Sequence, residues 1–126
     1  MSKGKVLAVD FDGVTSDYEG WLGKGRFAPP VDGVSLYLSR LKSEGWTIII
    51  HTCRSELKDV RRYLVEHSIP FDHLNYNPDN KKFGLSPKKP QADVYLDDRG
   101  ICFDGDWARA YELIVGFIPW RKRNIK

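Results

Sequence analysis

The sequence is poor in cysteine and carries little net charge. Two of its 126 residues are cysteines, Cys53 and Cys102, which are too few and too far apart for a disulfide framework or a zinc site. Twenty basic residues against 17 acidic ones leave a net charge of +3 at pH 7, which does not by itself indicate nucleic-acid binding. Reduced thiols are therefore expected, and the charge leaves the nature of the partner open.

Long apolar runs, internal repeats and low-complexity tracts are also missing from the sequence. The N-terminal apolar run, 6–9, stops at Asp10 and is far too short for a signal peptide or a membrane span. With 41% hydrophobic residues, a chain of 126 residues can bury one core but not two. We expect one soluble, cytoplasmic domain over residues 1–126, with a core at about 5–118 and a basic tail at 119–126.

Three short apolar runs predict strands buried on both faces, at 6–9, 47–50 and 94–96. Between the first two, apolar residues recur at helical spacing, with Asp32 as N-cap and Gly45 as the stop signal. Further helices are expected at 55–67 and 107–115. The segments 15–30 and 75–90 are rich in glycine, proline or asparagine and are expected to be loops, the first of which overhangs the site.

Alternating strands and helices predict an α/β fold, with one Rossmann-like, three-layer domain around a central parallel sheet. Ligands of such sheets bind at the carboxyl ends of the strands. The polar residues that follow the three strands should therefore converge on one edge of the sheet. These residues are Asp10, Asp12, Thr52, Arg54, Asp97 and Asp98.

Asp10 and Asp12 form the most informative pair. In an extended chain their side chains point to the same side, and Phe11 turns the other way into the core. Two neighbouring carboxylates repel each other unless a cation neutralises them, and their oxygens suit Mg²⁺. Gly13 then permits a tight turn. Taken alone, the DxDG segment is equally compatible with a strand that simply ends in a turn.

The full set of motifs resembles the haloacid dehalogenase (HAD) superfamily. The strand followed by Asp10, Asp12 and Gly13 matches the first motif, and the strand that ends at Thr52 matches the second. A lysine ahead of the last strand matches the third, with Lys89 as the better candidate and Lys88 as the alternative. Asp97 and Asp98 match the acidic pair of the fourth. The motifs occur in the family's order over residues 5–118.

The resemblance implies a magnesium-dependent phosphatase. Asp10 would attack phosphorus, and Asp12 would protonate the leaving group and then activate water. Thr52 and the lysine would bind the phosphoryl oxygens. Mg²⁺ would be held by Asp10, the backbone carbonyl of Asp12 and Asp97. Asp98 would either bind the metal through water or orient Lys89.

Residues near these motifs have two interpretations each. Arg54 and Arg99 would bind the substrate together with Gly13, or form ordinary ion pairs. Cys53 lacks a phosphate-binding CxxxxxR signature and is expected to pack. The basic tail, with Arg121, Lys122, Arg123 and Lys126, would contact nucleic acid or an acidic partner, or would only be solvated.

Neither interval between motifs is long enough for the cap domain of larger HAD enzymes, so no substantial cap is expected. An open site would admit bulky phosphorylated substrates, including nucleic-acid ends. The alternative function is a catalytically degenerate HAD domain that binds a phosphorylated ligand or protein. A phosphoaccepting receiver domain shares the acid, Thr and Lys, but it carries its lysine after the last strand rather than before an acidic pair.

Overall fold

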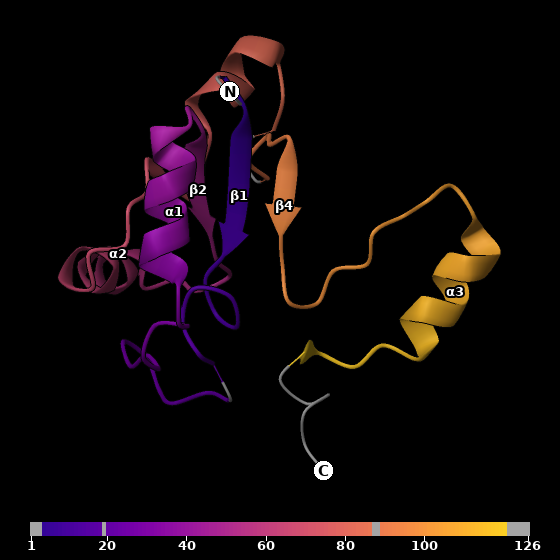
Figure 1. The fold of residues 1–126 in the computed structure, drawn as a ribbon, viewed down its shortest axis with the longest axis horizontal. Coiled ribbons are helices and arrows are strands. Elements are labelled where there is room, and N and C mark those ends of the chain that lie inside the picture. The colour runs from indigo at the N-terminus through magenta and orange to yellow at the C-terminus, as the bar shows by residue number, and fades with distance from the viewer. Residues whose placement is uncertain (1–3, 19, 87–88, 121–126) are drawn as a thin grey trace.

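The computed structural model describes residues 4–18, 20–86 and 89–120. Its centre is a parallel sheet with the strand order β3-β2-β1-β4. This confirms the predicted α/β class (Figure 1). In chain order the elements are β1 (Val6–Asp10), α1 (Val34–Ser43), β2 (Thr47–His51), α2 (Leu57–Glu66), β3 (His73–Leu74), the 3₁₀ helix η1 (Pro78–Phe83), β4 (Val94–Leu96) and α3 (Trp107–Val115).

The two central strands, β1 and β2, are buried on both faces, as their continuous apolar runs predict. Leu7 pairs with Ile48 and Val9 with Ile50, and in a parallel ladder paired residues project to the same face of the sheet. These four residues form one core cluster with Leu38 of α1 and Val60 and Leu64 of α2. Helices α1 and α2 therefore cover the same face, as expected for two right-handed crossovers that step in the same direction.

The structure corrects several details of the sequence-based prediction. Gly33, with φ of 90°, is the N-cap of α1, and no side chain caps this helix, so the expected cap at Asp32 is wrong. Residues 75–90 are not entirely loop, because η1 forms there, where the side chain of Asn77 accepts a hydrogen bond from the Asp79 amide. The short strand β3 also escaped prediction, since two residues are too few to show a pattern.

The edge strand β4 and the helix α3 are much less covered than the rest of the fold. All three residues of β4 are exposed, so the prediction that the strand at 94–96 is buried on both faces is wrong. The buried residue of α3 is Ala110. Figure 1 shows α3 at the end of a long excursion, well to the side of the layers formed by α1, α2 and the sheet. Among the described residues, no helix is long and apolar enough to cross a membrane.

Candidate active site

Three carboxylates meet at the carboxyl edge of the sheet. Asp10 ends β1, and Asp97 and Asp98 follow β4, which pairs with β1 in parallel. One oxygen of each carboxylate lies within 4.8 Å of an oxygen of the other two. The predicted convergence of Asp10 with the acidic pair is therefore present in the structure.

This crowding changes the protonation of Asp10. Burial raises the pKa of its carboxyl to about 8, and the hydrogen bond with Asp98 and the charges of Asp97 and Asp98 act in the same direction. Three charged carboxylates this close repel one another, and a divalent cation bound between them would remove this repulsion. Hard oxygen donors at a partly buried strand end fit Mg²⁺ by their chemistry.

Gly13 is required by the packing of Asp98. Its φ is 94°, and a Cβ at this position would clash with Oδ2 of Asp98. A side chain here would therefore both strain the backbone and push Asp98 out of the acidic cluster. The glycine of the DxDG segment thus serves the acidic cluster as well as the turn.

Asp12 has a different partner from Asp10. Arg54 donates two hydrogen bonds to its carboxylate, from Nε to Oδ2 at 2.8 Å and from Nη2 to Oδ1 at 2.9 Å. The side chain of Arg54 is only 5% exposed. Its guanidinium stacks 4.5 Å from the ring centre of Phe27 and 4.9 Å from that of Trp21. This two-pronged ion pair is the strong, orientation-specific kind.

One nitrogen of the Arg54 guanidinium makes no hydrogen bond. Its Nη1 is buried and has no hydrogen-bond partner, and it stands 3.9 Å from the Glu56 carboxylate. Attraction to Asp12 and Glu56 raises the pKa of Arg54 despite its burial. Nη1 is therefore paired with Glu56 by charge, but its hydrogen-bonding capacity is unused.

Thr52 is buried directly after β2 and is held by Asn75. The Thr52 amide donates to the Asn75 side-chain oxygen at 2.7 Å, and the Asn75 side-chain nitrogen donates to the Thr52 carbonyl at 2.8 Å. The hydroxyl of Thr52 accepts a hydrogen bond from the Arg54 amide at 3.1 Å. Its own proton therefore remains available to donate to a ligand.

The remaining predicted residues lie outside this cluster or outside the described chain. Lys89 is exposed and stands over the ring of Tyr95, with Nζ 4.8 Å from the ring centre. Arg99 is exposed, and its amide donates to Asp97. Lys88 and the basic residues Arg121, Lys122, Arg123 and Lys126 lie outside the described residues.

Sequence reasoning missed Lys24, Glu56 and Asn75, which shape the site, whereas lining of the entrance is one of two interpretations that the sequence allows for Tyr18 and Trp21. A hollow of about 390 Å³ beside Asp12 and Arg54 is lined by Tyr18, Trp21 and Lys24 from the loop and by Glu56. The expected overhang of the 15–30 segment is thus real. Glu56 and Asn75 carry no motif signal, because their partners are separated from them by 31 and 23 residues in the chain.

Comparisons with known proteins support the fold. No protein-family model matches the chain, and no curated protein is significantly similar to it. A conserved protein from Bacteroides thetaiotaomicron has a similar structure, with a TM-score of 0.64 and 23% identity over 97% of this chain and 98% of that one.

A chain in the structure of the Pnkp1/Rnl/Hen1 RNA repair complex is also similar. Its TM-score is 0.55 at 22% identity, over 79% of this chain and 38% of that one. This chain therefore corresponds to well under half of that protein's length. At such identities the likeness concerns the fold, and it places the chain among proteins that share this α/β architecture.

Proposed function

We propose that the protein is a magnesium-dependent phosphomonoester hydrolase of the HAD type that acts through an aspartyl-phosphate on Asp10. The observation that carries this proposal is the meeting of Asp10, Asp97 and Asp98 within 4.8 Å at the carboxyl edge of the sheet. Asp12, Thr52 and Arg54 stand at the same edge on the neighbouring loops. Mg²⁺, bound by the acidic cluster, would neutralise the carboxylates and the phosphoryl charge.

In this mechanism a carboxylate oxygen of Asp10 attacks phosphorus, and the bond from phosphorus to the ester oxygen breaks. The leaving oxygen takes a proton from Asp12. Water then attacks the aspartyl-phosphate and gives a proton back to Asp12, which releases phosphate and restores Asp10. Thr52 donates its hydroxyl proton to a phosphoryl oxygen.

Arg54 links substrate binding to the state of Asp12. Without substrate its guanidinium is bound to the Asp12 carboxylate through two hydrogen bonds, which engage both carboxylate oxygens. A phosphate dianion competes with Asp12 for the same guanidinium, whose Nη1 makes no hydrogen bond. Binding of the substrate would thus free Asp12 to carry the proton that the leaving group needs.

The hollow beside Asp12 suggests where the leaving group lies. Its walls include the aromatic rings of Trp21 and Tyr18, whose faces suit a flat ring. The charged residues of the lining are balanced, with Lys24 and Arg54 against Asp12 and Glu56. One protein of similar fold belongs to an RNA repair complex, which is a reason to include phosphorylated RNA ends among the substrates to be tested.

The proposal is tested by magnesium-dependent release of phosphate from a panel of nucleotides, phosphosugars, phosphopeptides and 3′- or 5′-phosphorylated oligonucleotides. Asp10→Asn is the matched control, because it preserves the shape of the site and removes the nucleophile. The proposal requires turnover by the native protein on at least one compound, with loss in Asp10→Asn and after chelation of Mg²⁺. Equal rates for the two proteins on every compound would refute it.

A second candidate function is a domain that binds a phosphorylated ligand without turning it over. The position of Lys89 over the ring of Tyr95 favours this alternative, because that contact engages the lysine that the mechanism needs at the phosphoryl group. Such a domain would bind phosphate or a phosphomonoester through Thr52 and Arg54 and would release no product. Calorimetry with an uncleaved ligand from the same panel would identify it.

A further inference from the structure

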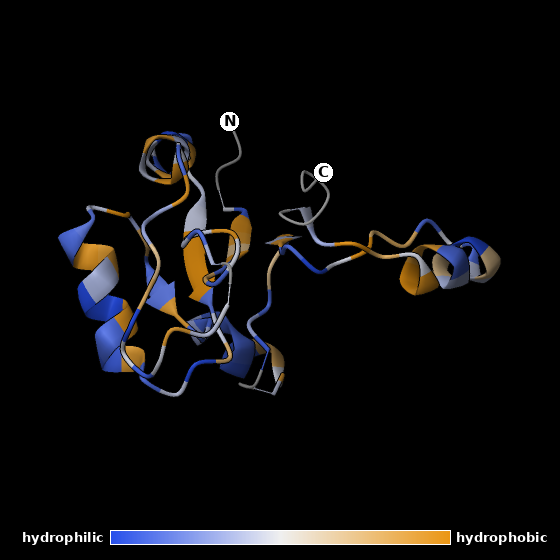
Figure 2. Cartoon of the chain, turned by 90° about the horizontal axis from the view of Figure 1, so that it is seen from below, coloured by the Kyte–Doolittle hydropathy of each residue, from blue (hydrophilic) through white to orange (hydrophobic). Residues whose placement is uncertain are grey.

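The C-terminal excursion carries an uncovered apolar stripe. In α3, Trp107, Tyr111, Ile114 and Val115 recur at positions i, i+4, i+7 and i+8, which places them along one side of the helix. Trp107 is 73% exposed and Tyr111 67% exposed. Figure 2 shows the apolar residues of α3 on a segment that is well separated from the helices and sheet of the body.

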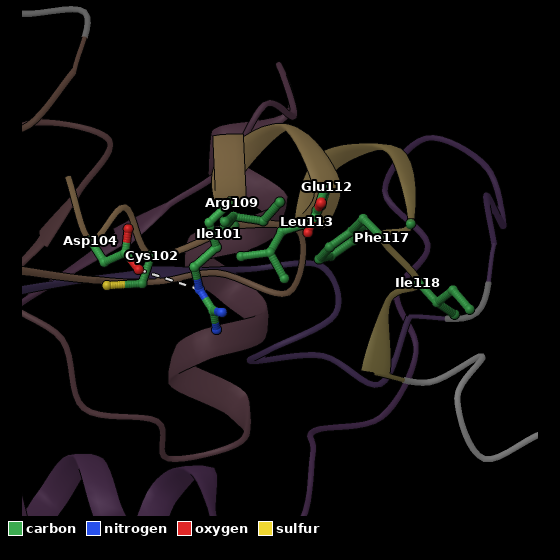
Figure 3. A pocket seen from close by; sticks show the side chains of 10 residues that line it. Ile101, Cys102, Asp104, Arg109, Glu112, Leu113, Phe117 and Ile118 are labelled. Atoms are coloured by element: carbon green, nitrogen blue, oxygen red, sulfur yellow. Dashed lines mark ion pairs between the residues drawn. The ribbon is translucent and has the colours of Figure 1, made fainter. Parts of the chain in front are cut away.

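The other side of α3 is occupied by its own loop. A hollow of about 700 Å³ lies between Gly100–Asp104 and the helix, with Leu113 and Phe117 in its wall. Figure 3 shows these side chains and the ion pair of Arg109 with Asp104. The ring of Phe103 also contacts that of Trp107, at 5.4 Å between ring centres. The loop and α3 therefore form one arm, defined as residues 99–120. The loop touches the stripe at Trp107, and Tyr111, Ile114 and Val115 do not line the hollow between the loop and the helix.

The sheet offers a matching uncovered surface. Val94 and Leu96 of β4 pair with Leu7 and Val9 of β1, so they project to the face that α1 and α2 cover elsewhere. Both are nevertheless about half exposed, Leu96 at 49%, because the two helices lie over β1, β2 and β3. Strands of parallel sheets are normally covered on both faces, and β4 lacks the helix that would complete this layer.

The arm is fastened away from this surface in its own chain. It begins at Arg99, whose amide donates a hydrogen bond to the Asp97 carboxylate, and it returns to the active-site edge. There the indole of Trp120 donates to the Gly13 carbonyl at 2.9 Å. For α3 to cover β4 of the same chain, this arrangement would have to open. A copy related by a two-fold axis can supply the same helix while each arm keeps its own anchors.

We propose that the protein forms a two-fold dimer by arm exchange, in which the stripe of α3 from one copy covers Val94 and Leu96 of the other. The contact occurs twice, as required for an isologous interface. Each large apolar side chain buries on the order of 100 Å² of surface. The two contacts together therefore bury on the order of 1,000 Å² or more, which is the size of a specific interface. The helix of the partner then supports the strand that leads to Asp97 and Asp98.

The mass of the full chain in solution is the first test. Light scattering after size exclusion should give twice the monomer mass of 14.5 kDa for the native protein. Tyr111→Arg should reduce the measured mass to that of the monomer, because the arginine places a charge in the stripe. The control Glu112→Arg, on the polar side of the same helix, should leave the dimer intact. Tyr111 is 67% exposed within its own chain, so the substitution does not disturb folding. A monomer at every concentration, or a dimer unaffected by Tyr111→Arg, would overturn the proposal.

A crosslink identifies which surfaces meet. Val94→Cys and Val115→Cys are placed in separate, differently tagged chains in which Cys53 and Cys102 are replaced by serine, and the two chains are co-expressed. A short bismaleimide should join them into a heterodimer, and should do so poorly when Tyr111→Arg is present in both. With both cysteines in one chain, a crosslink confined to that chain would show that α3 folds back on its own sheet and would contradict arm exchange.

Discussion

Replacing Arg54 by methionine should destabilise the protein by about 3 kcal/mol. Methionine keeps the apolar contacts with Trp21 and Phe27 but leaves the Asp12 carboxylate without its two hydrogen bonds. Breaking a buried ion pair by removal of one partner costs about 3–5 kcal/mol. The Asp12 side chain is 23% exposed and can be partly rehydrated, which sets the value at the lower end of that range.

The matched control is Arg62→Met. Arg62 also pairs with an aspartate, Asp59, at 3.0 Å, but its side chain is 65% exposed. A surface pair of this kind contributes less than about 1 kcal/mol. Urea denaturation of both variants, at fixed Mg²⁺ concentration, gives the two free energies of unfolding. A loss for Arg54→Met no larger than that for Arg62→Met would refute the description of the Arg54–Asp12 pair as buried and strong.

A double-mutant cycle separates the pair from other effects. Asp12→Asn removes the charge that Arg54→Met leaves unpaired, so the double variant should be more stable than the sum of the two single losses predicts. Additive losses would mean that Arg54 stabilises the fold through Glu56 and its aromatic neighbours rather than through Asp12.

Three further predictions concern other parts of the site and the fold. Gly13→Ala should destabilise the protein by about 2 kcal/mol, because the φ of Gly13 is 94°, and should abolish phosphate release, because the alanine Cβ would displace Asp98. Native rates and native stability in urea would contradict this. Asn75→Ala should cost about 1–3 kcal/mol, since it leaves the Thr52 amide and carbonyl without their partner, and an unchanged urea midpoint would show that water replaces the side chain. Burial raises the pKa of Asp72, but hydrogen bonds from Lys42 and the Ile48 amide outweigh it and hold the pKa below its usual 3.8. The charged Asp72 carboxylate therefore stabilises the folded state above pH 3.8, and this contribution is lost as the pH falls through the lower, folded-state pKa. Asp72→Asn should therefore cost about 1 kcal/mol at pH 7, with a difference from the native protein that shrinks below pH 3.8, and a difference independent of pH would refute this.

The sequence predicted those helices and strands whose pattern is contained within a few neighbouring residues. The helix at 107–115 and the strand at 94–96 have the predicted bounds, because helical spacing in the first and a short apolar run before an acidic pair in the second are contained within a few residues. Phe11 is fully buried, as alternation along an extended chain requires. The meeting of Asp10 with Asp97 and Asp98 was predictable because parallel strands bring their carboxyl ends to one edge.

Features that depend on distant contacts could not be predicted in this way. The ion pair of Arg54 with Asp12 joins residues 42 positions apart in the chain. Nothing in the sequence around Arg54 shows whether this arginine pairs with Asp12 or with a substrate. The periodicity of α3 indicates an apolar side but not what covers that side. The separation of α3 from the sheet therefore could not be predicted from the sequence. Asp32 is a good N-cap residue in general, but the left-handed conformation of Gly33 starts the helix instead.

The central claim, that Asp10 is the group that receives the phosphoryl unit, is tested most directly with beryllofluoride, which mimics an aspartyl-phosphate. The protein is titrated with beryllofluoride and Mg²⁺, and binding is followed by ¹⁹F NMR. We expect a bound signal that requires Mg²⁺ and disappears in Asp10→Asn. No bound signal in the native protein, or the same signal in Asp10→Asn, would contradict the assignment of Asp10 as the nucleophile.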